Sequence, residues 1–267
     1  KATLYGSAVR GAKPLKTDTK FPLIIISHGY PGNRYLMSHF GENLASKGYI
    51  VVSIDHTDSL YNDSAAFSST LYNRPRDQKF VLMKMDELNQ TSDHFLNGMV
   101  DSDNAGLIGY SMGGYGAVIN AGGNITEMVA GSKDFSPKEI LNTHTKSDEF
   151  DHHMSGLHFK AIMPIGPWGK ERGIWDDAGL SNATVPMFVI GGSQDDTSGY
   201  ENGIKAVILI GGGEPLAHPK VGEFIEYLGK HDIHIGITTN GSFIGRYLDV
   251  IAKHSTWTRI SMDAATD

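Results

Sequence analysis

The stretch that decides the fold is "GLIGYSMGGYGA" at residues 106–117, which joins an apolar run to a segment rich in small residues. It places Ser111 in the pattern G-x-S-x-G, with glycines at positions 109 and 113. A serine on a tight turn between a strand and a helix projects its hydroxyl clear of the backbone, and flanking glycines permit close backbone packing around it. The helix start also favours negative charge nearby. The stretch therefore predicts a strand, a sharp turn that presents Ser111 as a nucleophile, and a helix.

Four further apolar runs surround this stretch, and longer segments of helical period separate them. The runs are "FPLIIISHG" from residue 21, "YIVVSID" from 49, "FKAIMPIG" from 159 and "VPMFVIGG" from 185. Strands that are apolar on both faces are typical of a parallel sheet covered by helices. Residues 34–48 predict a helix that stops at Gly48, and residues 65–90 predict a helix interrupted near Pro75. Residues 1–204 are thus expected to form one α/β domain with a doubly wound, mostly parallel sheet.

After about residue 204 the pattern changes, and residues 205–267 predict a second unit. Strand, helix, strand, helix and strand follow one another in "AVILIGG", "PKVGEFIEYLGKHD", "IHIGITTNG", "SFIGRYLDVIAKHS" and "WTRISMD". This order predicts a compact βαβαβ extension with no spacer before it. An open sheet edge needs a cover, so the extension is expected either to continue the first sheet or to pair with a second copy as a homodimer.

The composition argues against several classes of function. A formal net charge of −7 without a block of lysines and arginines argues against a nucleic-acid partner. No apolar run reaches the roughly 18 residues of a membrane span. The absence of cysteine excludes disulfides, thiolate zinc sites and cysteine-bound iron–sulfur clusters. Localisation stays open, although a start at Lys1 without a leader weakly favours a secreted or periplasmic protein whose signal was removed.

The loop after the first strand predicts an oxyanion hole. In "IIISHGYPGN", residues 24–33, the strand ends and a glycine follows His28. In this architecture the loop supplies one backbone N–H and the residue after the nucleophile supplies the other, so Tyr30 and Met112 are the expected donors. His28 is expected to brace the loop rather than to act as a base.

The run "VPMFVIGGSQDD", residues 185–196, predicts the acid of a catalytic triad. A buried carboxylate that accepts the N–H of the base fixes the tautomer of that base, and the order Ser, Asp, His fits this kind of sheet. Asp195 is the expected acid, with Asp196 as the alternative. The polar stretch "DEFDHHMSG" at residues 148–156 is expected to be a solvated loop, and no metal site is predicted.

Residues 1–204 resemble the α/β-hydrolase superfamily, in particular its dienelactone hydrolase-like branch with cutinase-type polyester hydrolases and platelet-activating-factor acetylhydrolases. The residues that carry the resemblance are "SHGYPGNR", "GYIVVSIDHTDS", "RPRDQKFVL", "GLIGYSMGGYGA", "IMPIGPWG" and "VPMFVIGGSQD". The resemblance implies a cofactor-free serine carboxylesterase that cleaves small or polymeric esters through an acyl-enzyme. It also assigns Tyr30 and Trp168 to substrate contact.

The chain departs from this family where the catalytic histidine should follow the acid. The later histidines are His218, His231, His234 and His254. His218 follows a predicted strand where a base belongs, although about a dozen residues between acid and strand are few for a right-handed crossover. It is the predicted base, and the other three are expected to be structural. The alternative is a catalytically weak or silent hydrolase fold that acts as a binding protein.

The extension has a resemblance of its own. "VILIGGGEPLAHP" and "GITTNGSF" are similar to the middle of a radical S-adenosylmethionine enzyme, in which "GGEP" contacts the methionine amino group. Such enzymes need three cysteines for their cluster, and this sequence has none. Radical chemistry and binding of S-adenosylmethionine are therefore not expected, and "GGGEP" is predicted to be a structural turn. The simplest origin is a fused coding sequence.

Overall fold

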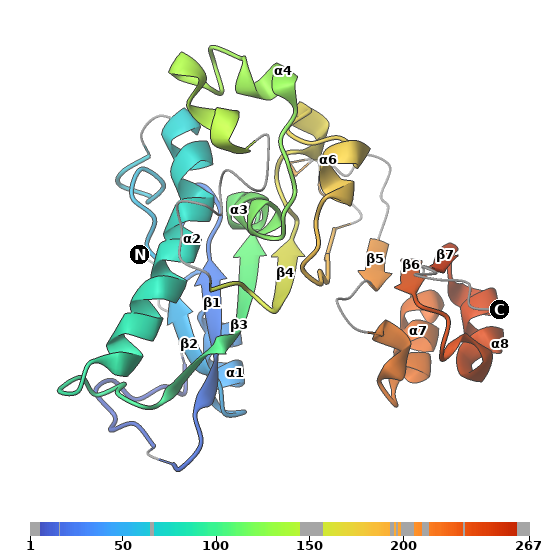
Figure 1. The fold of residues 1–267 in the computed structure, drawn as a ribbon, viewed down its shortest axis with the longest axis horizontal. Helices are drawn as coiled ribbons and strands as arrows, with labels where there is room; N and C mark the ends of the chain where they lie inside the picture. Colours follow the sequence, from blue (N-terminus) through green and yellow to red (C-terminus); the bar gives the residue numbers. More distant parts are fainter. Residues whose placement is uncertain are drawn as a thin grey trace, which may run out of the picture.

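The computed structural model describes residues 6–15, 17–64, 67–144, 157–192, 195, 197–198, 206–209, 214–231 and 233–260. Within these residues the named strands form two sheets, one in the order β2-β1-β3-β4 and one in the order β5-β6-β7. Figure 1 shows helices packed beside each sheet. All strand pairs inside the two sheets are parallel. The prediction of an α/β chain with mostly parallel strands is therefore confirmed.

The four-stranded sheet is built from the predicted apolar runs. Its strands are β1 (Phe21–Ser27), β2 (Ile50–Ser53), β3 (Val100–Tyr110) and β4 (Ala161–Ile165). Leu23 and Ile25 pack in a core cluster with residues of α2 (Phe67–Gln90) and α3 (Met112–Asn120). Ile26 belongs to another cluster, which includes side chains of α1 (Ser38–Ala45). Since alternate side chains of a strand point to opposite faces, helices cover both faces of this sheet.

Short helical segments complete the first part of the chain. They are α4 (Glu127–Ala130), η1 (Pro137–His144), η2 (Lys170–Arg172) and α6 (Asp177–Ser181). Gly48 has the expected left-handed conformation, with φ of 90°, but α1 already ends at Ala45. Within the described residues no helix is long and apolar enough to cross a bilayer.

The run predicted as a strand at residues 185–192 is corrected by the structure. It lies alongside β4 but makes only isolated parallel bridges, between Ile162 and Met187 and between Ile165 and Ile190. The N–H groups of Phe188 and Ile190 donate to carbonyls of β4 at 2.9 Å. Pro164 of β4 lies between these contacts and has no N–H to donate. The ladder is therefore interrupted at this proline.

The expected break at Pro75 is also wrong, because α2 continues through it. The Nδ2 of Asn120 donates to the Pro75 carbonyl at 3.0 Å, and the Nη1 of Arg76 donates to the Tyr72 carbonyl at 3.1 Å. Proline removes one helical hydrogen bond and crowds the preceding turn. Side-chain donors on either side of the proline thus support carbonyl groups of this part of the helix.

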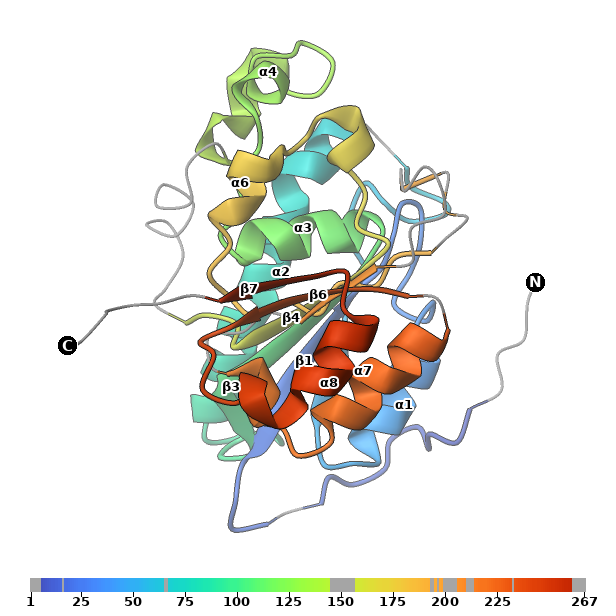
Figure 2. The same cartoon turned by 90° about the vertical axis from the view of Figure 1, so that its right-hand side faces the viewer.

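The predicted βαβαβ extension is confirmed. It contains β5 (Ala206–Leu209), η3 (Pro215–Ala217), α7 (Val221–Lys230), β6 (His234–Thr239), α8 (Ile244–His254) and β7 (Trp257–Ile260). Its apolar side chains form a core cluster of their own, in which Ile225, Ile235 and Ile237 are fully buried. Figure 2 shows α7 and α8 side by side beneath this small sheet.

One contact decides how the extension meets the first sheet. Leu209 of β5 forms an antiparallel bridge with Phe188, whose segment runs parallel to β4. The Phe188 ring also lies 6.0 Å from the ring of Phe224 on α7. In Figure 1 the arrow of β5 accordingly points opposite to those of β1, β3 and β4. The domain boundary expected near residue 204 lies outside the described residues, and the homodimer through the edge strand β7 stays a prediction.

The "GGGEP" and "TTNG" segments meet at Glu214. Its Oε1 accepts hydrogen bonds from the Leu216 N–H at 2.9 Å and from the Thr239 hydroxyl at 2.6 Å. Its Oε2 accepts from the Asn240 N–H at 2.8 Å. The carboxylate therefore joins the start of η3 to the end of β6. These contacts give Glu214 a structural role, and the three glycines of the motif lie outside the described residues.

Replacing Glu214 with glutamine is expected to destabilise the extension by about 2 kcal/mol, because an amide donor would replace a carboxylate oxygen that accepts from backbone N–H groups. Glu223→Gln on the exposed side of α7 is the control and should change stability by less than about 0.5 kcal/mol. Native-state proteolysis with cleavage sites mapped to residues 206–260 measures the difference. Equal cleavage rates for the two variants would contradict the structural role of Glu214.

Candidate active site

Ser111 lies at the sharp turn that the sequence predicted. It follows β3, precedes α3 and has φ of 51° and ψ of −112°. Its N–H donates to the Ile165 carbonyl at 2.8 Å, and its carbonyl accepts from the Trp168 N–H at 3.1 Å. A non-glycine residue with positive φ is strained and persists only when its surroundings hold it. The half-buried side chain has no hydrogen-bond partner for its hydroxyl among the described residues.

The glycines around Ser111 are required by close backbone contacts, as the sequence predicted. A Cβ on Gly113 would lie 2.1 Å from the carbonyl oxygen of Ser27, and a Cβ on Gly109 would lie 2.2 Å from the carbonyl oxygen of Gly113. A Cβ on Gly29 would lie 3.2 Å from the Cβ of Ser111. The turn thus packs directly against the end of β1 and the loop that follows it.

The loop after β1 holds Tyr30 beside this turn, and His28 braces the loop as expected. The His28 Nδ1 donates to the Gly29 carbonyl at 2.6 Å, while its Nε2 accepts from the His56 N–H at 3.2 Å. Only 2% of His28 is exposed, and burial lowers its pKa to about 4. With both ring nitrogens engaged, His28 is a neutral support of the loop and not a free base.

The second predicted donor, Met112, is the first residue of α3. N–H groups in the first turn of a helix have no acceptor within the helix, and the helix dipole favours an anion there. Gly29 in the loop lies against Ser111, so the two segments that carry the N–H groups of Tyr30 and Met112 are neighbours. The arrangement is suited to hold negative charge that develops next to Ser111.

Three aromatic side chains form a row beside the loop. The ring of Phe67 lies 5.3 Å from that of Tyr30 and 4.9 Å from that of Trp168, edge to face in both pairs. All three are partly buried against the core cluster around α3. Phe67 lies between Tyr30 and Trp168, the two residues that the family resemblance assigned to substrate contact. The sequence analysis did not identify Phe67, because it is the first residue of α2 and belongs to no recognisable motif.

Asp195 lies at the same end of the sheet as Ser111. Its Oδ1 accepts from the Thr197 N–H at 3.2 Å and from the Ser198 N–H at 2.9 Å. A Cβ on Gly166 would lie 2.9 Å from its Oδ2, and Gly166 directly follows the β4 residue that accepts from the Ser111 N–H. Local N–H donors therefore hold this carboxylate close to the end of β4. The alternative acid, Asp196, lies outside the described residues.

The structure does not bring His218 to Ser111. Pro215, at the start of η3, shares a pocket lining with Ala161, the first residue of β4, whereas Ser111 is bonded to the last residue of that strand. His218 is exposed and follows η3, and its Nδ1 accepts from the Lys220 N–H at 3.2 Å. Because β5 runs opposite to β4, η3 lies toward the amino end of the first sheet.

The remaining late histidines lie within the extension. The His231 Nδ1 contacts the Tyr227 carbonyl at 2.7 Å, and the His234 Nδ1 contacts the Thr256 hydroxyl at 3.2 Å. His254 is the last residue of α8. None of the described imidazoles hydrogen-bonds to Ser111. The described residues also contain no group of three histidine, aspartate or glutamate side chains that could hold a metal ion, and residues 148–156 lie outside them.

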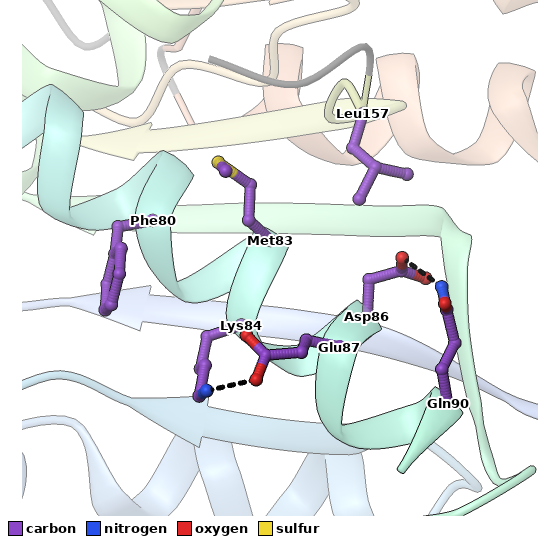
Figure 3. Close-up of a pocket in the computed structure, with 7 residues that line it drawn as sticks. All are labelled: Phe80, Met83, Lys84, Asp86, Glu87, Gln90 and Leu157. Atoms are coloured by element: carbon purple, nitrogen blue, oxygen red, sulfur yellow. Dashed lines mark hydrogen bonds and ion pairs between the residues drawn. The ribbon is translucent and has the colours of Figure 1, made fainter.

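Figure 3 shows residues that line a pocket on α2. The volume of this pocket is about 360 Å³. Its polar residues bond to one another, Lys84 with Glu87 at 2.5 Å and Gln90 with Asp86 at 2.6 Å. The hydroxyl of Ser102, near the start of β3, donates to Asp86. The pocket therefore lies at the amino end of β3, whereas Ser111 follows its carboxyl end.

Two family models match separate parts of the chain. Residues 3–100 match platelet-activating factor acetylhydrolase, isoform II, and residues 196–267 match the radical SAM superfamily. The two resemblances noted in the sequence are thereby confirmed: a hydrolase-like segment precedes a radical SAM-like segment. The first match ends before Ser111, so it covers the loop after β1 but not the nucleophile turn.

Curated relatives match a short stretch of the chain. The platelet-activating factor acetylhydrolase of Cavia porcellus is 50% identical over 58 residues, which are 21% of this chain and 13% of the relative. The enzyme of Canis lupus familiaris is 49% identical over 57 residues, or 20% of this chain and 13% of the relative. The enzyme of Bos taurus is 43% identical over 58 residues, which are 22% of this chain and 12% of the relative. The matches thus span about an eighth of these relatives and support a hydrolase of the lipase or esterase type.

Proposed function

We propose that residues 1–204 form the catalytic domain of an α/β-hydrolase-type serine carboxylesterase, in which Ser111 attacks the ester carbonyl and forms an acyl-enzyme. The observation that carries the proposal is the strained turn of Ser111, with its hydroxyl unengaged by the described residues at the start of α3. Structures hold such strain where function requires it. The similarity of residues 3–100 to an acetylhydrolase family supports the same reaction class.

In this proposal the N–H groups of Tyr30 and Met112 stabilise the oxyanion of the tetrahedral intermediate. In known hydrolases, each hydrogen-bond donor that points at the developing charge raises the rate by roughly 10²–10³-fold. The close packing of Gly29 against the Cβ of Ser111 supports this pair. The aromatic row of Tyr30, Phe67 and Trp168 would supply an apolar contact for the ester substrate.

Asp195 is the proposed acid, which would orient the base and stabilise its charged form. The base itself is the missing part of the triad, because none of the described imidazoles hydrogen-bonds to Ser111. A serine triad that lacks one member retains only about 10³–10⁴-fold acceleration over water, from its oxyanion hole and binding. We therefore expect slow reaction with activated esters and none with ordinary alkyl esters.

The placement of His218 favours a second candidate function. A hydrolase fold without an engaged base can bind an ester or acyl compound without turning it over. Such a binding protein would keep the aromatic row and the oxyanion donors but would leave Ser111 unreactive. The two candidates differ in one measurable property, which is the nucleophilicity of the Ser111 hydroxyl.

An alkyl fluorophosphonate is expected to label the wild-type chain slowly at Ser111, because phosphonylation needs a nucleophile and an oxyanion hole. Peptide mass spectrometry locates the adduct, and p-nitrophenyl butyrate measures turnover in parallel. Ser111→Ala should lose both signals, whereas Ser46→Ala, an exposed serine after α1, should keep them. A folded chain that stays unlabelled and hydrolyses no activated ester would overturn the esterase proposal in favour of the binding protein.

A further inference from the structure

Helix α2 presents two buried polar side chains to the end of β1. Arg74 and Gln78 are four residues apart, which places them on the same face of the helix. Their exposed fractions are 1% and 0%. A Cβ on Gly116 of α3 would lie 2.8 Å from atoms of both side chains, so α3 packs directly over them. Polar groups this deep are retained when each has a partner, and their partners show what they hold.

The side-chain amide of Gln78 joins β1 to α3. Its Nε2 donates to the Ser27 hydroxyl at 2.8 Å and to the Gly113 carbonyl at 2.9 Å. Its Oε1 accepts from the Asn120 Nδ2 at 2.9 Å. Both amide hydrogens and the amide oxygen are thus engaged. Ser27 is the last residue of β1, and Gly113 is the second residue of α3, so one amide connects the two segments that hold the proposed oxyanion donors.

A second chain of contacts orients Ser27. The His56 Nε2 lies 2.8 Å from the Ser27 hydroxyl oxygen, and its Nδ1 lies 2.8 Å from Asp77 Oδ2. Burial lowers the pKa of His56 well below its usual range, so the ring is neutral near pH 7. The His56 ring carries its proton on Nδ1, which faces Asp77. Its Nε2 therefore accepts a hydrogen bond from the Ser27 hydroxyl, and the Ser27 oxygen accepts one from Gln78. Ser27 is fully buried, so these three residues support the site and do not form a second nucleophilic triad.

Arg74 binds the same loop at His28, the residue after Ser27. Its Nη1 donates to the His28 carbonyl, and its Nη2 donates to the Ser59 hydroxyl. The carbonyl of His28 precedes Gly29, which lies against Ser111. The loop between β1 and Tyr30 is therefore fixed at two adjacent residues by side chains of a single helix.

We propose that Gln78 is a positioning residue that sets the separation between the N–H groups of Tyr30 and Met112, the two halves of the oxyanion hole. This inference rests on the proposed esterase function. Gln78 does not touch the substrate, and it acts through Ser27 and Gly113. Since oxyanion contacts strengthen in the transition state, a displaced donor lowers kcat and leaves KM nearly unchanged. Displacements of about 1 Å can cost a hundredfold in rate.

Gln78→Met keeps the length of the side chain and removes its amide, and we expect a drop in kcat for p-nitrophenyl butyrate of about tenfold or more. KM should change by less than about twofold. The fluorophosphonate labelling rate of Ser111 should fall with kcat, because the phosphonyl oxygen uses the same donors. Gln90→Met, which removes an exposed amide from the same helix, is the matched control and should retain the wild-type values.

Ser27→Ala provides a second variant, which removes the contacts of the Ser27 hydroxyl with Gln78 and His56 but keeps the contact of Gln78 with Gly113. We expect a smaller decrease in kcat, about threefold, with KM again unchanged. All rates are compared per folded molecule, at a temperature at least about 10 °C below each melting transition. A variant that melts earlier but reacts at the wild-type rate per folded molecule would reduce Gln78 to a stability role and overturn this inference alone. A wild-type chain that neither labels nor hydrolyses would overturn the esterase proposal together with it.

Discussion

Gly113→Ala is expected to lower the free energy of unfolding by about 4 kcal/mol or more, enough to unfold many single domains. The new Cβ would lie 2.1 Å from the carbonyl oxygen of Ser27 and 2.7 Å from its carbonyl carbon. Both are backbone atoms of β1, which is paired with β2 on one side and β3 on the other. Neither atom can move without its strand, so the steric clash is relieved only if α3 moves away from the sheet.

Urea unfolding followed by far-UV circular dichroism measures this loss. Gly245→Ala is the matched control, because a Cβ there meets nothing within 4 Å on α8. Alanine has the higher helix propensity, so this control should leave stability unchanged or raise it by about 0.5–1 kcal/mol. If Gly113→Ala unfolds at the same urea concentration as the wild type, the packing of α3 against β1 is not as the structure has it.

The sequence was most informative where local pattern and backbone requirement coincide. The apolar runs at β1 to β4 and the alternation in residues 206–260 became strands and helices, because burial on both faces leaves a readable signature. Two expectations failed where distant atoms decide the outcome. The strand expected at residue 185 lost its regular ladder at Pro164, which belongs to another strand, and α2 continued through Pro75, whose carbonyl accepts a hydrogen bond from Asn120 of α3.

The candidate site likewise contains residues that the sequence identified and residues that it did not. Ser111 and its glycines are readable because one turn imposes all of their requirements. Gln78 and Arg74 belong to "RPRDQKFVL", which was recognised as part of a resemblance without a role for either side chain. Their partners lie between 15 and 51 residues away in sequence, and no periodicity encodes that pairing. His218 was expected beside Ser111 because it follows a strand, but a strand pattern does not reveal the direction in which the strand runs.

Acidification from pH 7 to pH 4 is expected to remove at least about 4 kcal/mol of stability, because three histidines are buried in their neutral form. Burial lowers the pKa of His28 to about 4, and burial together with Arg76 lowers that of His144 to about 3. His56 shifts in the same direction. Between these values and the ordinary 6.5, the unfolded chain binds protons that the folded chain does not. Each of the two histidines with a stated pKa thus contributes a loss of about 3 kcal/mol by pH 4.

Asp77 works in the opposite direction. Burial raises its pKa from 3.8 to about 6, so between these values the folded chain binds the proton more tightly and acidification favours folding. Its side chain is 37% exposed, however, and solvent screening reduces its contribution below that of one buried histidine. The histidines therefore determine the sign, and stability falls as pH decreases below about 6.5.

Urea unfolding at pH 7, 6, 5 and 4.5 should accordingly show a steep fall in stability, and His144→Gln should flatten it by up to about 1.4 kcal/mol per pH unit. Glutamine cannot take up a proton, although it will lower stability at pH 7 because His144 contacts Arg76 at 2.7 Å and the Tyr115 hydroxyl at 3.2 Å. His39→Gln, at an exposed position on α1, should keep the wild-type dependence. The slope of stability against pH separates the two effects, since a lost contact shifts the whole curve whereas a lost titration changes its steepness. A His144→Gln curve parallel to the wild type would show that His144 is not the buried neutral imidazole that its surroundings imply.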